Sequence, residues 1–420
     1  MSDEPRNIAY ITSRYPIVSH TFVQREILGL RGVGFGVETF TVRETHPSHH
    51  RTDVDRQEAQ QTVAIVTRSP RRLFKYLIWP ALRNIQAVAR GFRVSAHGHW
   101  GDPRQLLWRL FYTAEAVILW QECSRRKVRH IHAHHADVAS NLAQLAAFIG
   151  EFVDGPEAGW RWSFTLHGPT ELMGVSEHDL ASKASSAQFV ACISDFTRSQ
   201  LMLHSTPDNW DRFHIAHCGI DPNRFVPPNN TAVPANGGVD KPFTVLSVGR
   251  ISAQKGFPIL VDAMAQLTSK SSRPVRLIAA GEGPERHELQ ARANELGVDA
   301  QFIGAVGQDE ILDLYHQADA FCLPSFMEGL PVVLMEAMSC EVPVVTTDIA
   351  GIGELVVHEQ TGLLARPGRA DMAADQLLRL VEDADLCQRL GRAGRQAVAA
   401  EFDINQTVDI MATLFGQSRS

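Results

Sequence analysis

The clearest chemical signal in the sequence is a pair of glutamates in the run PSFMEGLPVVLMEAM, residues 324–338. Glu328 directly follows an apolar stretch that predicts a strand, and Glu336 lies almost two turns into the helix predicted after it. Amide groups at the start of a helix can bind an anionic diphosphate, and Pro331 fits the first turn because its missing amide costs no hydrogen bond there. Glu336 could accept hydrogen bonds from both hydroxyls of a ribose, and Glu328 could accept hydrogen bonds from hydroxyls of a bound sugar. The predicted donor-binding residues of this run are Glu328, Gly329, Leu330, Pro331, Val332 and Glu336; the alternative is two solvated helix carboxylates.

A second signal is a pair of cations, Arg250 and Lys255, in the segment VGRISAQKGF. They flank a tight loop that begins at Gly249, after a predicted strand, and leads into a helix. Two cations together with helix-end amides can neutralise a pyrophosphate leaving group without a metal. The turn AGEGP has glycines at Gly281 and Gly283, which would allow the backbone to approach a base or a phosphate closely. The alternative for the two cations is an ordinary exposed loop.

Polar residues also follow predicted strands in the first half of the chain. His167 ends a strand in the segment FTLHGPTEL, where it could hydrogen-bond a sugar or orient an acceptor, and Glu171 follows in the same segment. The alternative is a structural histidine. Arg198 follows another predicted strand and could meet a phosphate. The predicted acceptor contacts are Ser19, His20, His134, Glu171 and Arg198.

Three histidines, His130, His132 and His134, alternate along one predicted strand and therefore share one of its faces. Zinc would be conceivable there, but no cysteine or acidic residue stands beside them in the sequence. We therefore predict no metal site, and we assign His134, at the end of the strand, to the ligand side.

Both halves of the chain alternate short apolar runs with amphipathic stretches, a pattern that predicts βαβ units and parallel sheets. We expect an α/β protein with two doubly wound domains and a ligand site in the cleft between them, beyond the carboxyl ends of the strands. A segment rich in Pro and Asn predicts a linker between the domains. The predicted parts are a first domain 1–225, a linker 226–240, a second domain 241–403, and a closing helix at about 404–416 that packs back on the first domain. The expected strands are 8–12, 37–42, 128–133, 161–166, 189–193, 213–217, 244–248, 275–280, 301–303, 320–323 and 342–346.

Composition excludes several classes of protein. With 44% hydrophobic residues in a chain of 420, the sequence is neither disordered nor collagenous, nor a disulfide scaffold. Its net charge of −7 argues against nucleic-acid binding. The six cysteines are scattered, without a CxxC pair, as in reduced proteins of the cytoplasm. The polar start of the sequence and the lack of any run of about 18 apolar residues predict neither a signal peptide nor a spanning helix.

A basic tract at residues 68–93 departs from this acidic average, and no Asp or Glu occurs from 59 to 101. A basic helix with interleaved aromatic residues fits the surface of an anionic membrane, which predicts peripheral contact with the inner face of the cell membrane. The alternative is a packing helix with a solvated basic face. No recognition motif for RNA accompanies the tract. Its residues are Arg68, Arg71, Arg72, Lys75, Arg83, Arg90 and Arg93, with Phe74, Tyr76, Trp79 and Phe92.

The second half of the chain resembles the family 4 glycosyltransferases, which have the GT-B fold of two Rossmann-like domains. The resemblance rests on VGRISAQKGFPILVDAM, AAGEGPERHEL, LPSFMEGLPVVLMEAMSCEVPVVTTDIAGIGELV and TGLLARPG. The first half looks like the bacterial exopolysaccharide branch, of the colanic-acid type, in SRYPIVSHTFVQREI, HIHAHHADVASNLA, SFTLHGPTEL and CISDFTRSQLM. The resemblance implies a retaining hexosyltransferase that takes a nucleotide-diphosphate sugar as donor and a glycan or lipid-linked acceptor, with neither metal nor pyridoxal phosphate as cofactor.

The resemblance also implies roles for individual residues. Arg250 and Lys255 would hold the diphosphate, Glu336 the ribose and Glu328 the hydroxyls of the sugar, and His167 would contact that sugar from the other domain. The predicted catalytic residues are accordingly His167, Arg250, Lys255 and Glu328. Other reactions on the same fold, an epimerase or a phosphorylase, remain alternatives, as does a nucleotide-sugar-binding protein without activity. The base, the sugar, the acceptor and the oligomeric state are left open.

Overall fold

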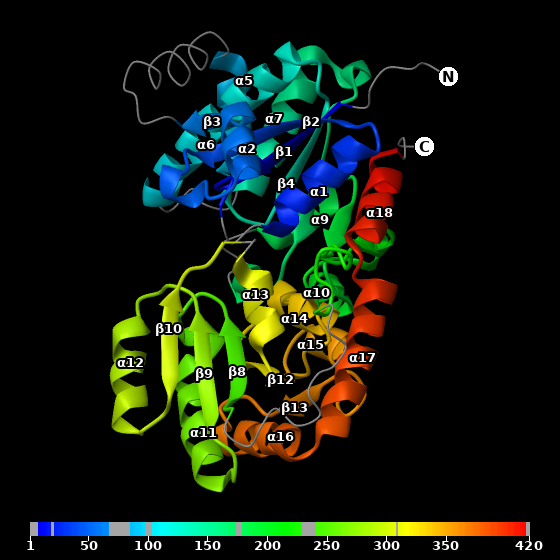
Figure 1. Ribbon diagram of the computed structural model, residues 1–420. Helices are drawn as coiled ribbons and strands as arrows, with labels where there is room; N and C mark the ends of the chain where they lie inside the picture. The colour runs from blue at the N-terminus through cyan, green and yellow to red at the C-terminus, as the bar shows by residue number, and fades with distance from the viewer. Residues whose placement is uncertain are drawn as a thin grey trace. The chain divides into compact units, whose positions relative to one another are not determined.

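The computed structural model describes residues 7–17, 21–66, 85–96, 103–173, 179–228, 241–307 and 310–416. The chain forms two compact units (Figure 1). Unit 1 contains Met1–Ala216 together with Val408–Ser420, and unit 2 contains His217–Thr407. Each unit is built around a parallel sheet, so the predicted α/β class with two doubly wound domains is confirmed.

Unit 1 has a seven-stranded sheet with the order β3-β2-β1-β4-β5-β6-β7, and its paired strands are parallel. The strand order changes direction between β1 and β4, which is the point at which doubly wound sheets bind ligands. The strands are β1 Asn7–Thr12, β2 Gly36–Arg43, β3 Val63–Val66, β4 His130–His134, β5 Arg161–Leu166, β6 Val190–Cys192 and β7 Phe213–Ile215.

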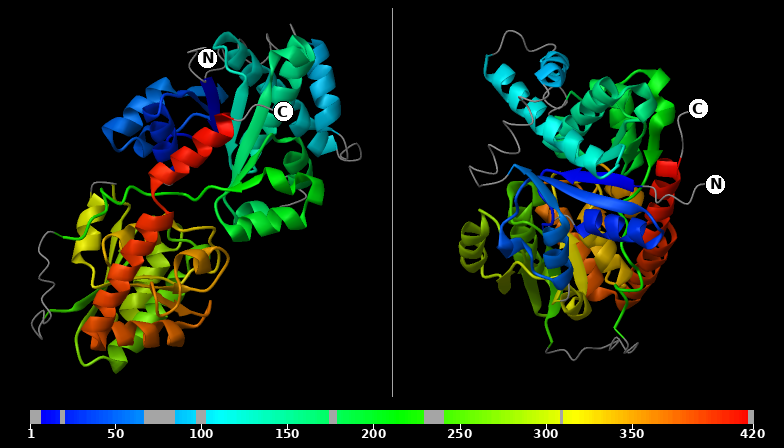
Figure 2. Two further views of the ribbon diagram at one scale, coloured as in Figure 1. Left: turned by 90° about the vertical axis from the view of Figure 1, so that its right-hand side faces the viewer. Right: turned by 90° about the horizontal axis from the view of Figure 1, so that it is seen from above.

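The two faces of this sheet have different chemistry because side chains alternate along each strand. One face is apolar, with Ala9, Ile131 and Phe164 in a hydrophobic core that also includes buried residues of α6 and α7. Figure 2 shows α5 and α6, in cyan, beside one another and away from the red α18. The helices of unit 1 are α1 Thr21–Gly32, α2 Asp53–Gln61, α5 Ile85–Ser95, α6 Pro103–Arg125, α7 Val138–Asp154, α8 Pro169–Met173, α9 Leu180–Ser186 and α10 Asp195–Leu203.

The opposite face is polar and carries Tyr10, His130 and His132, which are nevertheless buried. It is closed by α18, Ile404–Gly416, whose Phe415 ring lies 5.0 Å from that of His130 and 5.3 Å from that of His132. The end of the chain therefore supplies part of the core of unit 1.

Unit 2 has a six-stranded parallel sheet with the order β10-β9-β8-β11-β12-β13, and its order changes direction between β8 and β11. Its strands are β8 Phe243–Val248, β9 Val275–Ala280, β10 Ala300–Gly304, β11 Ala320–Leu323, β12 Val344–Thr347 and β13 Leu363–Ala365. Its helices are α11 Phe257–Lys270, α12 Arg286–Glu295, α13 Glu310–Gln317, α14 Val332–Ser339, α15 Ile352–Leu355, α16 Ala370–Glu382 and α17 Ala384–Glu401.

The boundary between the units falls at Ala216/His217 rather than at 225/226, where the linker was predicted. The physical reason is that the segment after Ala216 is bound to unit 2. Ile220 exchanges backbone hydrogen bonds with Phe402 and Ile404, and the buried Phe225 accepts from Ser339 through its carbonyl. Of the predicted linker, 229–240 lies outside the described residues.

Candidate functional site

The best-supported site lies in unit 2, at the carboxyl ends of β8 and β11, where the strand order changes direction. The loop after β8 ends in a short 3₁₀ helix, Ala253–Lys255, and the loop after β11 carries Glu328. Lys255 Nζ lies 2.7 Å and 3.0 Å from the two carboxylate oxygens of Glu328. Ser325 donates a second hydrogen bond, 2.7 Å long, to Glu328 Oε1. The structure thus joins two residues that the sequence placed in separate motifs.

Backbone contacts hold the loops of this site together. Phe326 N donates to Gln254 O, and Ile251 N donates to Glu282 O, so the loops after β8, β9 and β11 form one hydrogen-bonded layer. A Cβ at Gly281 would lie 1.8 Å from Gly249 O, and one at Gly283 would lie 1.8 Å from Ile251 O. These glycines are therefore required by the neighbouring loop, a reason different from the approach to a phosphate or base that we predicted.

The helix of the glutamate pair begins later than predicted. α14 starts at Val332, and Pro331 is its N-cap with an extended backbone rather than a residue of the first turn. Glu336 is 2% exposed and accepts a hydrogen bond of 3.1 Å from the Tyr315 hydroxyl of α13. Tyr315 therefore fixes the carboxylate that we predicted for the ribose, a contact that no local pattern in the sequence indicated.

Arg250 has an exposed side chain, in contrast to Lys255, whose side chain is 23% exposed and paired. Arg250 directly follows Gly249, at the carboxyl end of β8. An exposed guanidinium can pair with an anionic group with little desolvation.

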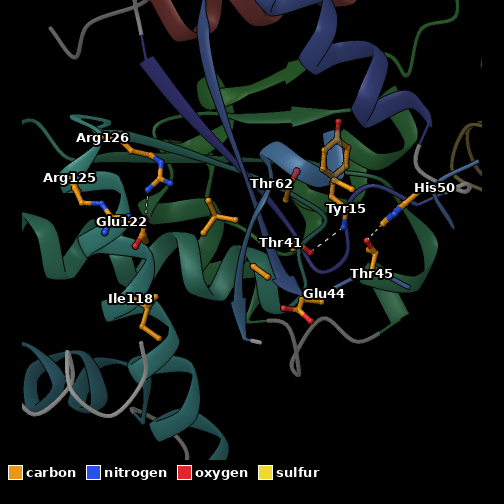
Figure 3. A pocket seen from close by; sticks show the side chains of 13 residues that line it. Tyr15, Thr41, Glu44, Thr45, His50, Thr62, Ile118, Glu122, Arg125 and Arg126 are labelled. Carbon is orange, nitrogen blue, oxygen red and sulfur yellow. Dashed lines mark hydrogen bonds and ion pairs between the residues drawn. The ribbon is translucent and has the colours of Figure 1, made fainter. Parts of the chain in front are cut away.

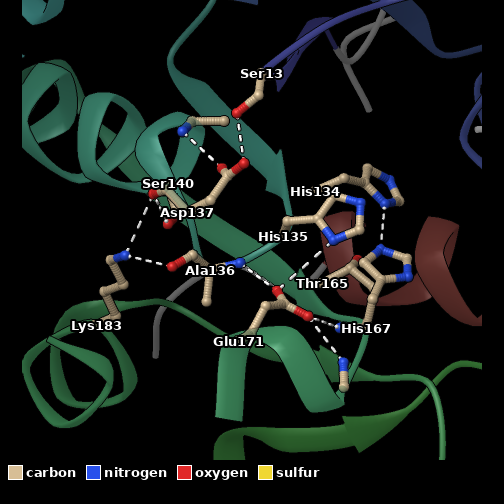
Figure 4. Close-up of polar contacts among 12 residues, drawn as sticks. Ser13, His134, His135, Ala136, Asp137, Ser140, Thr165, His167, Glu171 and Lys183 are labelled. Atoms are coloured by element: carbon tan, nitrogen blue, oxygen red, sulfur yellow. Dashed lines mark hydrogen bonds and ion pairs between the residues drawn. The ribbon is translucent and has the colours of Figure 1, made fainter. Parts of the chain in front are cut away.

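In unit 1, the loops after the neighbouring strands β4 and β5 meet beside the point where the strand order changes direction, which lies between β1 and β4 (Figure 4). His134 Nδ1 and His167 Nε2 are 2.9 Å apart and share a hydrogen bond. His167 is only partly buried, whereas His134 is completely buried. His134 thus contacts His167, and its assignment to the ligand side stays a prediction; His167 remains the candidate for ligand contact.

Glu171 has a structural role in these loops, and its contact with an acceptor stays a prediction. It is 4% exposed and accepts from the amides of Ala136, His167 and Gly168, which clamps the loops after β4 and β5 to each other. Burial by itself would raise the pKa of Glu171, but the hydrogen bond and charge of His135 and the amide donors lower it below its usual value. Both oxygens of the carboxylate thus already have hydrogen-bond donors within the protein.

Lys183 of α9 supports the same loops and was not predicted. It is completely buried and donates to the carbonyl oxygens of Ala136, at 2.9 Å, and Asp137. Burial lowers the pKa of Lys183 to about 7. A single lysine in a polar segment, LASKASS, has no sequence signature that would reveal such burial.

Three predicted acceptor residues remain, Ser19, His20 and Arg198. Ser19 and His20 lie outside the described residues. Arg198 pairs with Asp195 at 2.6 Å on the same helix, α10, with 39% of its side chain exposed.

One group in the described part of the chain could hold a metal: Glu26, His132 and His134, whose ligand atoms lie within 4.8 Å of one another. Glu26, the acidic partner, comes from α1 and is far from these histidines in the sequence, so no local pattern indicates it. However, His132 already shares both ring nitrogens with hydroxyls, those of Ser163 at 2.8 Å and Thr165 at 2.9 Å. A metal would have to displace one of these hydrogen bonds.

Unit 1 also has a pocket of about 510 Å³ (Figure 3). Arg125 and Arg126, which line it, both pair with Glu122, and Arg126 also pairs with Glu38. The pocket is lined by Tyr15, Thr41, Glu44, Thr45, His50, Ala59, Thr62, Val63, Ala64, Ile118, Glu122, Arg125 and Arg126, and none of our predicted site residues is among them.

Residues 230–397 match the family described as glycosyl transferases group 1. The chain is 34% identical over 187 residues to a glycogen synthase of Mycobacterium tuberculosis, an alignment that covers 44% of each protein. It is 30% identical over 201 residues to the amylovoran biosynthesis glycosyltransferase AmsK of Erwinia amylovora, covering 46% of this chain and 48% of that protein. These matches span less than half the length of either relative.

The fold is similar to that of HepE from Anabaena, a structure solved in complex with UDP. The TM-score is 0.72 with 18% identity, over 98% of this chain and 99% of that one. No helix in the described residues has the length and apolar character needed to span a membrane. The chain has the GT-B fold, and its residues 230–397 match the family described as glycosyl transferases group 1.

Proposed function

We propose that the protein is a retaining glycosyltransferase that moves a hexose from a UDP-sugar to a glycan or lipid-linked acceptor. The observation that carries this proposal is the Lys255–Glu328 pair at the strand-order reversal of unit 2, within the segment that matches the group 1 family. UDP is the nucleotide that we favour because HepE was solved with UDP, with UDP and glucose, and with UDP-glucose. A role in exopolysaccharide or glycolipid synthesis is supported by the similarity to AmsK.

In the proposed mechanism, Arg250 and Lys255 neutralise the departing diphosphate together with the amides that begin α14. Lys255 contacts the phosphates while its ammonium remains hydrogen-bonded to Glu328. The carboxylate of Glu328 accepts hydrogen bonds from hydroxyls of the sugar. Glu336, held by Tyr315, accepts the ribose hydroxyls. The leaving phosphate accepts the proton of the acceptor. We infer that the reaction needs no metal because two cations already serve the diphosphate.

The test is release of UDP from a panel of UDP-sugars by the wild type, by Lys255→Ala and by Lys270→Ala. Lys270 is the matched control, since it also contacts a carboxylate at 2.6 Å, that of Asp375, on an exposed surface of the same unit. We expect Lys255→Ala to lose at least about tenfold in activity, as for loss of a charged hydrogen bond, and Lys270→Ala to lose none. Equal activity of all three proteins would refute the assignment of the site.

Product analysis separates the alternatives. An epimerase would give free nucleotide and an epimerised sugar without an acceptor, and a phosphorylase would require inorganic phosphate. A binding protein would bind UDP-sugar tightly without turnover on any acceptor. Transfer to an added acceptor, with retention of anomeric configuration, would exclude all three.

We also propose peripheral contact of unit 1 with an anionic membrane. Most of the basic tract, Arg68 to Arg83, lies outside the described residues, but α5 carries Arg90 and Arg93. In the neighbouring helix α6, Trp108 is 52% and Phe111 is 44% exposed, as interfacial aromatic residues would be. Co-sedimentation with phosphatidylglycerol vesicles should fall in Trp108→Ser/Phe111→Ser but not in Trp210→Ser, a control tryptophan that is 40% exposed. No binding by the wild type would refute this proposal.

A further inference from the structure

The carboxylate of Glu328 has two hydrogen-bond donors of different kinds. The ammonium of Lys255 contacts both carboxylate oxygens, at 2.7 Å and 3.0 Å. The hydroxyl of Ser325 donates at 2.7 Å to Oε1 only. The Lys255 side chain is flexible and 23% exposed, whereas Ser325 is completely buried. In the proposed mechanism Lys255 also serves the diphosphate, so Ser325 is the donor that has no second task.

The backbone around Ser325 is held from two sides. Thr347, at the end of β12, donates through its hydroxyl to the carbonyl oxygen of Ser325 at 2.6 Å. The amide of Phe326 donates at 2.8 Å to a carbonyl of the loop after β8. A Cβ at Gly256 would lie 2.0 Å from Pro324 O, so the same two loops also pack directly against each other. The fold therefore sets the position of the Ser325 hydroxyl before any ligand binds.

These hydrogen bonds make the two oxygens of Glu328 unequal. An ionised carboxylate offers about four acceptor positions, two on each oxygen. Among the described residues, Oε1 has two donors, Lys255 and Ser325, so both of its positions are filled. Oε2 has Lys255 alone, at the longer distance of 3.0 Å. Glu328 is thus left with one open acceptor position, on Oε2.

We propose that Ser325 is a positioning residue, which orients Glu328 so that only Oε2 accepts a hydrogen bond from the donor sugar, and from a single hydroxyl. This inference rests on the proposed function, in which Glu328 contacts that sugar. A carboxylate held in this way distinguishes hexoses that differ at one carbon, because an epimer directs its hydroxyl elsewhere and leaves a largely buried acceptor unpaired. Ser325 therefore affects the choice among UDP-hexoses and not the binding of the UDP part.

The decisive variant is Ser325→Ala, which removes the hydroxyl and leaves Lys255 as the donor to Glu328. The carboxylate can then turn, and Oε1 gains an open position. We expect kcat/KM for UDP release from the preferred UDP-hexose to fall about tenfold, as for loss of one hydrogen bond to a charged group. Its epimers should lose much less, so discrimination falls by a similar factor. The Kd of UDP alone should change less than about twofold, because UDP carries no sugar hydroxyl for Glu328.

Ser339→Ala is the matched control. Ser339 is also completely buried in unit 2 and donates at 2.7 Å, but to the carbonyl oxygen of Phe225 rather than to a carboxylate. Both alanine variants should lose stability in calorimetry, and only Ser325→Ala should lose discrimination among the hexoses. In a Glu328→Ala background, Ser325→Ala should cause no further loss of activity.

A second pair of variants tests the anchor of Ser325 and keeps the inference testable if Ser325→Ala does not fold. Thr347→Val releases the carbonyl of Ser325 and should lower discrimination in the same direction. Thr346→Val is its control, because Thr346 is 1% exposed on the same strand and donates at 2.8 Å to the carbonyl of Leu323. This control should keep the discrimination of the wild type.

Three results would overturn the inference: unchanged discrimination in Ser325→Ala, an equal loss in Ser339→Ala, or a Kd of UDP weakened as much as kcat/KM. The last result would mean that Ser325 merely supports the loops that bind phosphate. Failure of the proposed function looks different. If the wild type releases UDP from no UDP-sugar, or if Glu328→Ala keeps full activity, the proposed function itself fails. If both requirements are met and Ser325→Ala behaves as the wild type, only the role of Ser325 fails.

Discussion

Removing Lys255 should destabilise unit 2, whether or not the donor is present. Glu328 is 8% exposed and lies between the ammonium of Lys255 and the hydroxyl of Ser325. In Lys255→Ala, the carboxylate keeps the Ser325 hydrogen bond but loses its cation. It then becomes an incompletely compensated charge in a largely desolvated place.

The size of the effect follows from the burial of the pair. Breaking a fully buried ion pair from one side costs about 3–5 kcal/mol. The Lys255 side chain is 23% exposed, so water can replace part of the lost interaction. We therefore expect about 2 kcal/mol, which for a unit of this size lowers Tm by about 4–8 °C. Glu328→Gln in the Lys255→Ala background should recover most of this loss, because no unpaired charge remains.

The assay must observe unit 2 separately. All seven tryptophans of the chain precede residue 217, so tryptophan fluorescence reports on unit 1 and not on unit 2. Calorimetry resolves both transitions, and fluorescence then identifies the one that belongs to unit 1. A Lys255→Ala protein within about 0.5 kcal/mol of the wild type would refute the reasoning, since such small effects are typical of exposed pairs. So would a double variant as unstable as the single one.

Three other outcomes are expected. Because burial lowers the pKa of Lys183 to about 7 from its usual 10.5, the unfolded chain binds more protons than the native state between these values, and stability rises with pH there. Relative to Lys183→Met, the wild type should gain about 2 kcal/mol in free energy of unfolding between pH 7 and pH 9, and a flat difference in urea titrations would contradict this. Phe415→Ala, which empties a position that is 6% exposed, should destabilise unit 1 by about 3 kcal/mol, measured by tryptophan fluorescence; a change confined to unit 2 would be inconsistent with this packing. EDTA should leave UDP release unchanged, and a loss restored by Mg²⁺ would show that the two cations do not suffice.

The local pattern predicted the strands well where apolar runs are short and bounded by turns. The bounds predicted for β5, β9 and β11 agree with the structure. Helix α6 was not predicted, because its first half exposes Leu107 and Trp108 whereas its second half is buried, so it lacks a single apolar face. Asp53 and Asp55 lie in the first turn of α2, where Thr52 and Asp55 form a capping box.

The sequence predicted only a part of the candidate site. Lys255 and Glu328 belong to motifs at the ends of adjacent strands, so topology alone brings them together. Glu26 and His134 are far apart in the sequence, and only the packing of α1 on the sheet joins them. Burial gives His134 and Glu171 contacts within the protein that the sequence did not indicate, because a polar residue at or after the end of a strand can turn toward the protein as readily as toward a ligand.

The division of α18 between the units has a consequence for how the protein is made. The chain leaves unit 1 at Ala216 and returns to it only at Val408, within this last helix. A ribosome therefore completes the whole of unit 2 before it releases the residues that cover His130 and His132. During synthesis the nascent first unit keeps an uncovered face until the final helix emerges, and any chain cut short before Phe415 would leave that face open for chaperones to recognise.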